Sequence, residues 1–192
     1  MSTEATTGGV TTYTYDPDDA TPAVGGPSLL PKTEPVDNRA HEARTDLAVF
    51  RGAALSAPLE IAGQPIARIR FRSSAPSYDV FVRITDVHPD GTSMTVCDGI
   101  RRIGAVGTLE TDPAPDDDGF REVEVRLWPA FHRFAAGHSV GIQVSSGAHP
   151  RYARNPGSAE AAFDAAATQV AVQEISHEGP DASRIELPVW VR

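Results

Sequence analysis

The feature that most constrains this chain is a series of short runs in which apolar and polar residues alternate. In the clearest run, Ala67, Ile69 and Phe71 alternate with three arginines, which gives one apolar and one cationic face. A period of two is that of a β-strand with one buried side. Further alternating or short apolar runs lie at 47–50, 59–61, 80–87, 93–100, 122–127, 140–145, 170–172 and 185–191. Roughly eight to ten short strands with turn signals between them predict an all-β protein, a jelly-roll β-sandwich.

The connections between these runs also favour an all-β fold. His88–Gly91 reads His-Pro-Asp-Gly, in which proline presets φ and glycine accepts the left-handed conformation, so a hairpin returns through 93–100. The one helical candidate is the alanine-rich segment 158–167, which is too short to form a layer. Nothing resembles a βαβ succession, so a small α/β-hydrolase is disfavoured.

The 192 residues predict a single domain. Residues 1–12 are rich in threonine and glycine and are expected to form a disordered tail, followed by one β-sandwich domain over 13–192. Within that domain, residues 16–45 contain Asp-Pro, Gly-Gly and several further prolines, and they predict an extended, irregular lead-in to the strands.

Net charge and composition exclude several classes of partner and site. The net charge of −9 disfavours a nucleic-acid partner. The sequence has no apolar run long enough to cross a membrane and no signal-peptide pattern at its start, so a cytoplasmic protein is expected. Cys97 is the only cysteine, which excludes an internal disulfide and a cysteine-based zinc site; its strand-like surroundings predict a small buried side chain.

One motif suggests catalysis. Gly137–Gly141 matches the serine-hydrolase pattern G-x-S-x-G with Ser139 as the nucleophile. That pattern requires a buried strand before the serine and a helix after it. Here residues 131–136 do not read as a buried strand, and the alternating residues that follow read as a strand. Ser139 is therefore expected to be the first residue of a strand. Ser139, Asp164 and His177 occur in the order of a hydrolase triad, here called the paper triad, but such an order arises by chance in most chains of this length. No catalytic residue is predicted.

Other candidate sites have simpler interpretations. The aspartate runs at 16–19 and 112–118 lack the EF-hand spacing and predict solvated loops. Five histidines show no i, i+4 or His-x-His pairing and are expected to serve as turn and hydrogen-bonding residues: His88, His132, His138, His149 and His177. The arginines at 68, 70 and 72 are expected to pair with acidic residues across strands rather than to bind an acidic ligand. No metal and no cofactor is predicted.

Aromatic residues are sparse, and Trp128, Phe131 and Phe134 cluster around a turn. A sugar-binding platform would need exposed, coplanar rings, so a buried hinge or an interdomain plug is the favoured interpretation.

Several longer phrases, taken in order, are more specific than any of these motifs. They are Tyr13–Gly26 (YTYDPDDATPAVGG), Val36–Arg39 with Glu42–Arg44, Ser73–Asp79 (SSAPSYD), Asp86–Gly91 (DVHPDG), Cys97–Ile100 (CDGI), Leu127–Pro129, Ala136–His138, Val144–Ser146, Pro150–Pro156 (PRYARNP) and Leu187–Val189. The set resembles the C-terminal β-jelly-roll domain of the X-Pro dipeptidyl-peptidase and cocaine-esterase family of serine hydrolases, a galactose-binding-domain-like fold. The resemblance covers about residues 13–191.

The resemblance implies a non-catalytic accessory domain. In that family the catalytic triad belongs to an α/β-hydrolase domain upstream, and none of its positions maps onto this chain. The jelly roll packs on the hydrolase domain, in the same chain or as a separate one, helps to wall the substrate cleft and often makes oligomer contacts. The apolar segment after the Gly-Gly pair tends to approach the cleft, so Leu29 and Leu30 are the predicted substrate contacts.

The chain departs from the family pattern at Ala20 and at 103–107, which puts cleft contacts of the latter loop in doubt. It could be an excised domain, a truncated frame or one subunit of a split enzyme. Two alternatives stay open: a carbohydrate- or ligand-binding module, which an exposed aromatic shelf would favour, and a small esterase that uses Ser139.

Overall fold

The computed structural model of the chain describes residues 9–26, 36–104, 111–160, 164–177, 179 and 181–191. Within these ranges the regular structure is almost entirely β. The strands are β1 (Val10–Tyr15), β2 (Leu47–Arg51), β3 (Leu59–Gly63), β4 (Ile66–Ser73), β5 (Tyr78–Val87), β6 (Ser93–Ile103), β7 (Arg121–Arg126), β8 (Ala130–Phe134), β9 (Ser139–Ser145), β10 (Ala171–Ser176) and β11 (Arg184–Glu186). A 3₁₀ turn, η1 (Pro17–Asp19), and a short helix, α1 (Arg39–Glu42), precede β2.

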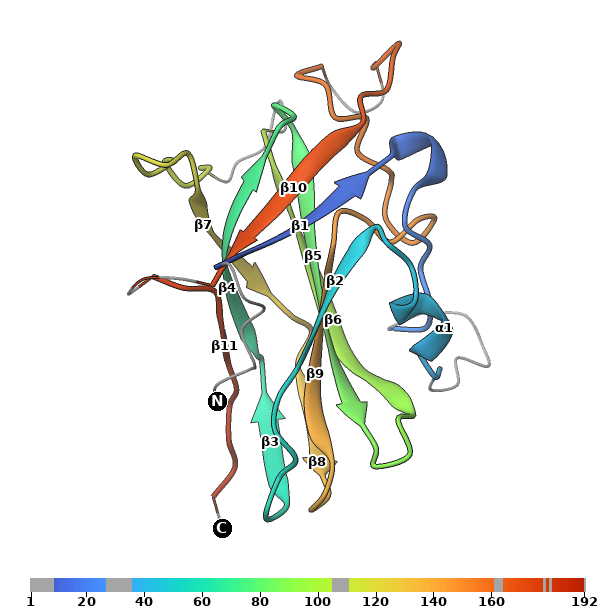
Figure 1. Cartoon of the computed structure of the whole chain (residues 1–192), viewed down its shortest axis with the longest axis vertical. Coiled ribbons are helices and arrows are strands. Elements are labelled where there is room, and N and C mark those ends of the chain that lie inside the picture. The colour runs from blue at the N-terminus through green and yellow to red at the C-terminus, as the bar shows by residue number, and fades with distance from the viewer. Residues whose placement is uncertain are drawn as a thin grey trace.

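Two antiparallel sheets form a β-sandwich, which confirms the predicted fold class (Figure 1). The first sheet has the order β1-β10-β4-β11, with β7 on the opposite edge of β4. The second sheet has the order β2-β9-β5-β6. A two-stranded ladder of β3 and β8 lies at the lower end of Figure 1. No helix in the described parts of the chain has the length and hydropathy that crossing a bilayer requires.

The core lies between the two sheets and follows the alternation seen in the sequence. In β4, Ala67, Ile69 and Phe71 are buried, as predicted from their period of two. The facing sheet contributes the corresponding alternate residues of β5 and β9: Val80, Val82, Ile84, Val140, Ile142 and Val144. Because both inner faces are apolar, packing them against each other removes them from water, which is the main stabilising term of such a fold.

The arginines on the outer face of β4 pair with acidic side chains, as predicted. The ion pairs are Arg68–Glu124 (2.7 Å), Arg70–Asp116 (2.6 Å) and Arg72–Glu174 (2.7 Å). Two of the three acidic partners lie on the neighbouring strands β7 and β10, and Asp116 lies in the loop before β7. This cationic face is therefore neutralised within the chain.

The hairpin between β5 and β6 has the predicted turn chemistry. Gly91 has φ +88°, and its N–H donates to the carbonyl oxygen of His88 at 2.9 Å. The Asp90 carboxylate accepts from the Thr92 N–H at 2.9 Å. On β6, Cys97 is buried as expected, and burial raises the pKa of its thiol to about 12, so the side chain stays protonated.

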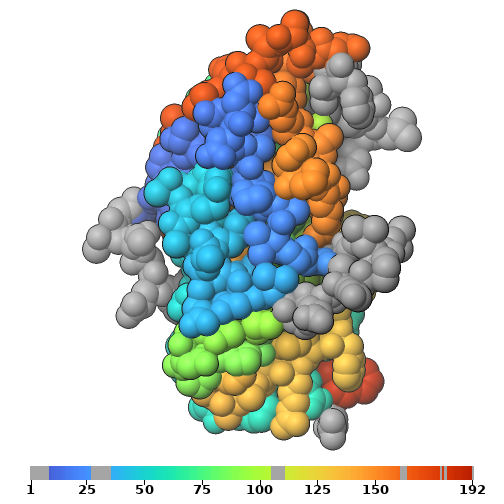
Figure 2. Space-filling view, turned by 90° about the vertical axis from the view of Figure 1, so that its right-hand side faces the viewer, coloured from blue at the N-terminus to red at the C-terminus, as the bar shows by residue number. Residues whose placement is uncertain are grey.

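β5 is buried along its whole length and on both faces. Its inner face belongs to the core, whereas its outer face is covered by the lead-in and by the loop 146–157. These two covering segments lie side by side on the surface in Figure 2, and the backbone of His149 bonds to that of Thr21 and Ala23. The described parts of the lead-in, 16–26 and 36–45, are thus largely irregular, as predicted, and they cover the second sheet.

Two sequence predictions about regular structure were wrong. β1 begins at Val10, inside the predicted disordered tail, and pairs with β10 from Val10↔Ser176 to Tyr15↔Ala171. Its threonines and tyrosines favour strands, and Tyr13 and Tyr15 are buried. The alanine-rich segment 158–167 forms no helix in its described residues, 158–160 and 164–167; so short a segment is marginal without an apolar face to pack.

β8 is the third difference from the sequence predictions. Residues 131–136 did not read as a buried strand and no strand was predicted there, yet Ala130–Phe134 forms a largely unburied strand that pairs with β3. The inward positions are Ala130, His132 and Phe134, of which only Phe134 is fully buried. With one large apolar residue among three inward positions, the alternation was too weak to detect.

Candidate functional site

Ser139 is the first residue of β9, as predicted from the alternation that follows it. The chain runs from β8 through a turn at 135–138 directly into β9, and Ser139 pairs with Val87 of β5. A nucleophile elbow needs a helix after the serine to raise its hydroxyl above the sheet. Ser139 lies instead at the start of a ladder, although the strand before the turn is β8 rather than an irregular segment.

The partners of the paper triad are not assembled around Ser139. Among the described residues, no histidine hydrogen-bonds the Ser139 hydroxyl. His177 lies after β10, in the other sheet, and its Nε2 bonds the Thr11 hydroxyl at 2.7 Å. Asp164 is exposed on a loop. The three residues therefore do not form a nucleophile–base–acid chain.

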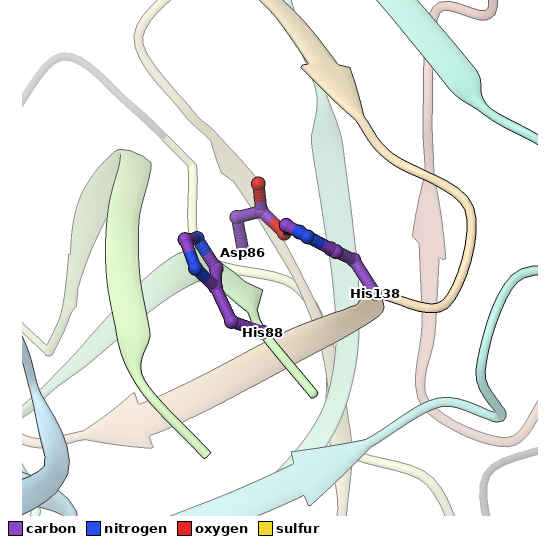
Figure 3. A group of neighbouring side chains, drawn as sticks. All are labelled: Asp86, His88 and His138. Carbon is purple, nitrogen blue, oxygen red and sulfur yellow. Dashed lines mark hydrogen bonds and ion pairs between the residues drawn. The ribbon is translucent and has the colours of Figure 1, made fainter. Parts of the chain in front are cut away.

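A compact polar cluster lies beside Ser139, where β5, β8 and β9 come together. Its centre is Asp86, near the end of β5, whose side chain is only 7% exposed. Its carboxylate accepts from His138 Nδ1 at 2.8 Å and from His132 Nε2 at 3.0 Å. The imidazole of His88 lies against that of His138, with 4.3 Å between ring centroids. Figure 3 shows Asp86, His88 and His138 converging.

The sequence interpretation of these histidines was partly confirmed. His132 and His138 do act as hydrogen-bonding residues, but the sequence offered no sign that they share one carboxylate. They lie 46 and 52 residues from Asp86 along the chain. Only the pairing of β5 with β9, in which Asp86 lies opposite Val140, brings His138 to Asp86.

A buried ionic network lies on the outer face of the second sheet. Asp98 and Arg83 are almost fully buried, with Arg83 Nη2 3.2 Å from Asp98 Oδ2. Arg151, in the loop 146–157, bonds both oxygens of the same carboxylate, and Arg83 donates to Asn38 Oδ1 at 2.8 Å. Burial lowers the pKa of Arg83. The network thus joins the sheet to both segments that cover it.

A second network binds the same loop to the other end of the sheet. Asp79 accepts from Arg102 at 2.7 and 2.8 Å and from the Asn155 amide at 3.1 Å. Tyr15, whose hydroxyl donates to the Asn155 carbonyl, is buried, and burial raises its pKa to about 12. Asp79, Asn155 and Tyr15 come from the phrases on which the resemblance rests, so these phrases contain residues that hold the loop on the sheet.

Leu29 and Leu30, the predicted substrate contacts, lie outside the described residues. The residues on either side are fixed beside Asp98. A side chain at Gly26 would collide with Arg151 and Asp98, and the Asn38 amide donates to the Val36 carbonyl at 2.9 Å. Gly26 and Val36, the described residues that flank the two leucines, therefore lie on the outer face of the second sheet.

Large apolar side chains are exposed at the end of the molecule formed by β3, β8 and the C-terminal segment. Phe131 is 82% and Trp190 is 55% exposed. Phe131 pairs with Ala62, and Trp190 follows Val189, which bridges to Ile61. Since directly paired residues share a face and neighbours alternate, Phe131 and Trp190 point to the same outer side.

We define the apolar end face as Phe131 and Trp190; Trp128 and Val191 are also exposed, at 56% and 83%. The favoured idea of a buried hinge was wrong for Trp128 and Phe131, and held only for Phe134, which is fully buried. Because Trp128 and Phe131 are exposed, two interpretations remain: a plug against a neighbouring domain, and a platform of rings that binds a ligand.

A partly open apolar cavity of about 360 Å³ lies between the two sheets. Its lining includes Phe50, Val140, Ile175 and Leu187, with His177 and Arg184 as polar groups. The cavity lies between β9 of one sheet and β10 and β11 of the other. A small apolar ligand would fit its chemistry better than a sugar would.

Fold and sites together define an all-β sandwich domain whose polar networks hold its own loops. Comparison with known proteins makes the assignment more specific. Residues 2–186 match the family model described as the X-Pro dipeptidyl-peptidase C-terminal non-catalytic domain. The chain belongs to this family.

Relatives of the chain are larger proteins. It is 34% identical over 186 residues to cocaine esterase of Rhodococcus sp. (strain MB1 Bresler), a match that covers 94% of this chain and 32% of that protein. Among solved structures it is similar to an aminopeptidase from the marine sediment archaeon Thaumarchaeota archaeon, with a TM-score of 0.84, 26% identity and coverage of 97% and 34% of the two chains. It is also similar to an α-amino acid ester hydrolase, with a TM-score of 0.80 and 26% identity, and the match covers 96% of this chain and 33% of that one. The chain thus spans about a third of each relative.

Proposed function

We propose that this chain is the accessory domain of a serine hydrolase that acts on acyl or peptide substrates. In this role it packs on an α/β-hydrolase catalytic domain, in the same polypeptide or as a separate chain, and helps to wall the substrate cleft. The observation that carries the proposal is the match to a non-catalytic family domain over one third of larger hydrolases. The position of Ser139 at the start of β9 favours a structural role for this domain over a catalytic one.

The apolar end face is the surface through which we propose that the domain docks. Isolated soluble domains rarely expose several large apolar side chains together, and such patches mark interaction sites. Phe131 and Trp190 lie on one side of a short ladder, and aromatic residues are enriched at protein interfaces. We propose the same face for homo-oligomer contacts when no hydrolase domain is present.

Leu29 and Leu30 remain the proposed contacts on the substrate side. The described residues that flank them, Gly26 and Val36, lie next to the residues of the Asp98 network, which supports this proposal. The cytoplasmic location and the likeness to galactose-binding modules stay predictions.

The experiment is co-purification with the α/β-hydrolase encoded beside or in frame with this chain. We expect a 1:1 complex with the unaltered chain and its loss in the double variant Phe131→Ser/Trp190→Ser. Val172→Ser, which removes a 43% exposed apolar side chain from β10, is the matched control and should bind normally. Absence of a hydrolase partner, or equal binding by the double variant, would contradict the proposal.

A ligand-binding module is the second candidate, and the apolar cavity is the observation that favours it. In that case a fatty acyl or aromatic probe should bind the isolated chain with a 1:1 stoichiometry by calorimetry. Val140→Phe, which would fill the cavity, should abolish binding. If no such probe binds, the cavity is only a packing defect between the sheets.

A further inference from the structure

The cluster around Asp86 contains more histidine than its hydrogen bonds require. Asp86 needs one N–H donor for each oxygen, and His138 and His132 supply these at 2.8 and 3.0 Å. His88 is a third imidazole against the same group, and it makes no side-chain hydrogen bond to the described residues. Its ring nitrogens are therefore available to another partner.

We propose that Asp86, His88 and His138 bind a divalent transition-metal ion of the Zn²⁺ type. One ligand atom of each residue lies within 4.8 Å of those of the other two. Metal–ligand bonds of about 2.0–2.1 Å at tetrahedral angles need ligand atoms about 3.3 Å apart. His88 begins a surface turn, so it can approach by the small distance needed. The ion replaces the hydrogen bond between His138 Nδ1 and Asp86: Nδ1 loses its proton and coordinates through its lone pair, and the ring becomes the neutral tautomer that is protonated at Nε2.

His132 completes the arrangement from outside the ligand set. Its Nε2–H group bonds Asp86 Oδ2, which leaves Oδ1 as the oxygen that faces His138. A hydrogen bond of this kind fixes the orientation of a ligating carboxylate, and such outer partners tune metal affinity. The ring of His132 is itself held edge-on against buried Phe134, with 4.7 Å between centroids.

The donor set selects the class of ion. Two imidazole nitrogens and one carboxylate oxygen suit Zn²⁺, Co²⁺, Ni²⁺ or Cu²⁺, whereas Ca²⁺ and Mg²⁺ need several oxygen ligands. Three protein ligands leave a fourth position for water. Asp86 is buried while His88 and His138 are half-buried, so the ion can enter from solvent.

A bound ion would join two turns that the backbone does not connect directly. His88 belongs to the β5–β6 turn and His138 to the β8–β9 turn. β8 carries Phe131 of the apolar end face, so metal binding would stiffen the support of that face. The inference does not depend on the proposed function, because it concerns ion binding by the isolated chain.

The test is titration of the tag-free full chain with ZnCl₂ by isothermal calorimetry after removal of metals with EDTA and dialysis. We expect one Zn²⁺ per chain, no heat from CaCl₂ or MgCl₂, and a rise in Tm of roughly 5–10 °C at about one hundred times Kd. Co²⁺ should give the visible absorption of a four-coordinate site at the same stoichiometry.

Variants separate this site from a purely structural hydrogen-bond cluster. His88→Gln and His138→Gln should each weaken Zn²⁺ binding roughly 100-fold or more, and His132→Gln about 10- to 100-fold. His149→Gln, at an exposed histidine in another loop, should bind as the unaltered chain does. His88→Gln leaves both Asp86 hydrogen bonds intact, so its fold, checked by circular dichroism, should be unchanged. No binding by the unaltered chain, or equal binding by His88→Gln, would overturn the proposal.

Discussion

At the scale of single residues, burial explains why particular polar side chains occur where they do. Asp98, Arg83 and Arg151 form a network that would be costly if any member lacked its partner, because an uncompensated charge would remain in the interior. The fold requires such residues at these positions. Short phrases such as Cys97–Ile100, which contains Asp98, therefore point to the family although their residues have no catalytic role.

His41 gives a pH dependence at this scale. It is 7% exposed, and burial with the nearby Arg83 lowers its pKa from 6.5 to about 4, with Arg44 adding to this and Asp46 and Glu42 opposing it. Below pH 6.5 the unfolded chain takes up a proton that the folded chain refuses. The free energy of unfolding should therefore fall as the pH drops from about 6.5 to about 4, by about 3 kcal/mol from this residue.

The measurement is urea unfolding of the unaltered chain and of His41→Gln at pH 7, 5.5 and 4.5. Burial also lowers the pKa of His177, which contributes in the same direction. The prediction therefore compares the two proteins. Between pH 7 and pH 4.5, the free energy of unfolding should fall less in His41→Gln than in the unaltered chain. Parallel pH profiles would show that His41 is not the cause.

Sequence reasoning at the residue scale worked where the evidence was local. The alternation after Ser139 was enough to place it at the start of a strand, and the run around Cys97 was enough to predict burial. The cluster of Asp86, His88 and His138 could not be predicted, because it depends on which strands pair. Nothing in the local sequence of His132 or His138 carries that information.

At the scale of elements, the second sheet depends on the irregular segments that cover it. β5 is buried on both faces because the lead-in and the loop 146–157 lie over its outer side. The covering segments have little regular structure of their own, so their order comes from side-chain attachments such as Asn38–Arg83 and Arg151–Asp98. Removing one attachment should therefore loosen a whole segment.

Asp98→Asn is the change that tests this attachment. The amide keeps the shape but leaves Arg83, 1% exposed, with an unpaired buried charge, so the free energy of unfolding should fall by about 3–5 kcal/mol. Urea unfolding gives this value, and faster hydrogen exchange should be seen at residues 146–157. Asp117→Asn, at an exposed position, is the control and should stay within about 0.5 kcal/mol. A loss below about 1 kcal/mol for Asp98→Asn would show that the network is not the attachment.

Most elements followed from the sequence, and the exceptions have physical reasons. β4 was clear because its apolar and charged residues alternate without interruption. β8 was missed because His132 occupies an inward position that an apolar residue usually takes, and β1 because its threonines gave no apolar stripe. Alanine content suggested a helix at 158–167, but composition without an apolar face to pack does not fix one.

At the scale of the whole molecule, the chain corresponds to one portion of larger related proteins. It spans about a third of the proteins to which it is similar, and the exposed Phe131 and Trp190 lie where β8 and the C-terminal segment both pair with β3. Its internal charges are largely matched by one another, as in the pairs of β4 and the Asp98 network. The apolar end face exposes two large aromatic side chains among the described residues, which is why we assign docking to it.

The central claim is that this chain supports a hydrolase and does not itself form an acyl-enzyme. Labelling of the purified chain with a fluorophosphonate probe tests it most directly, with a family esterase as the positive control. The account predicts no labelling at Ser139, because that hydroxyl opens β9 and no histidine among the described residues bonds it. Labelling of the chain that disappears in Ser139→Ala would contradict the account.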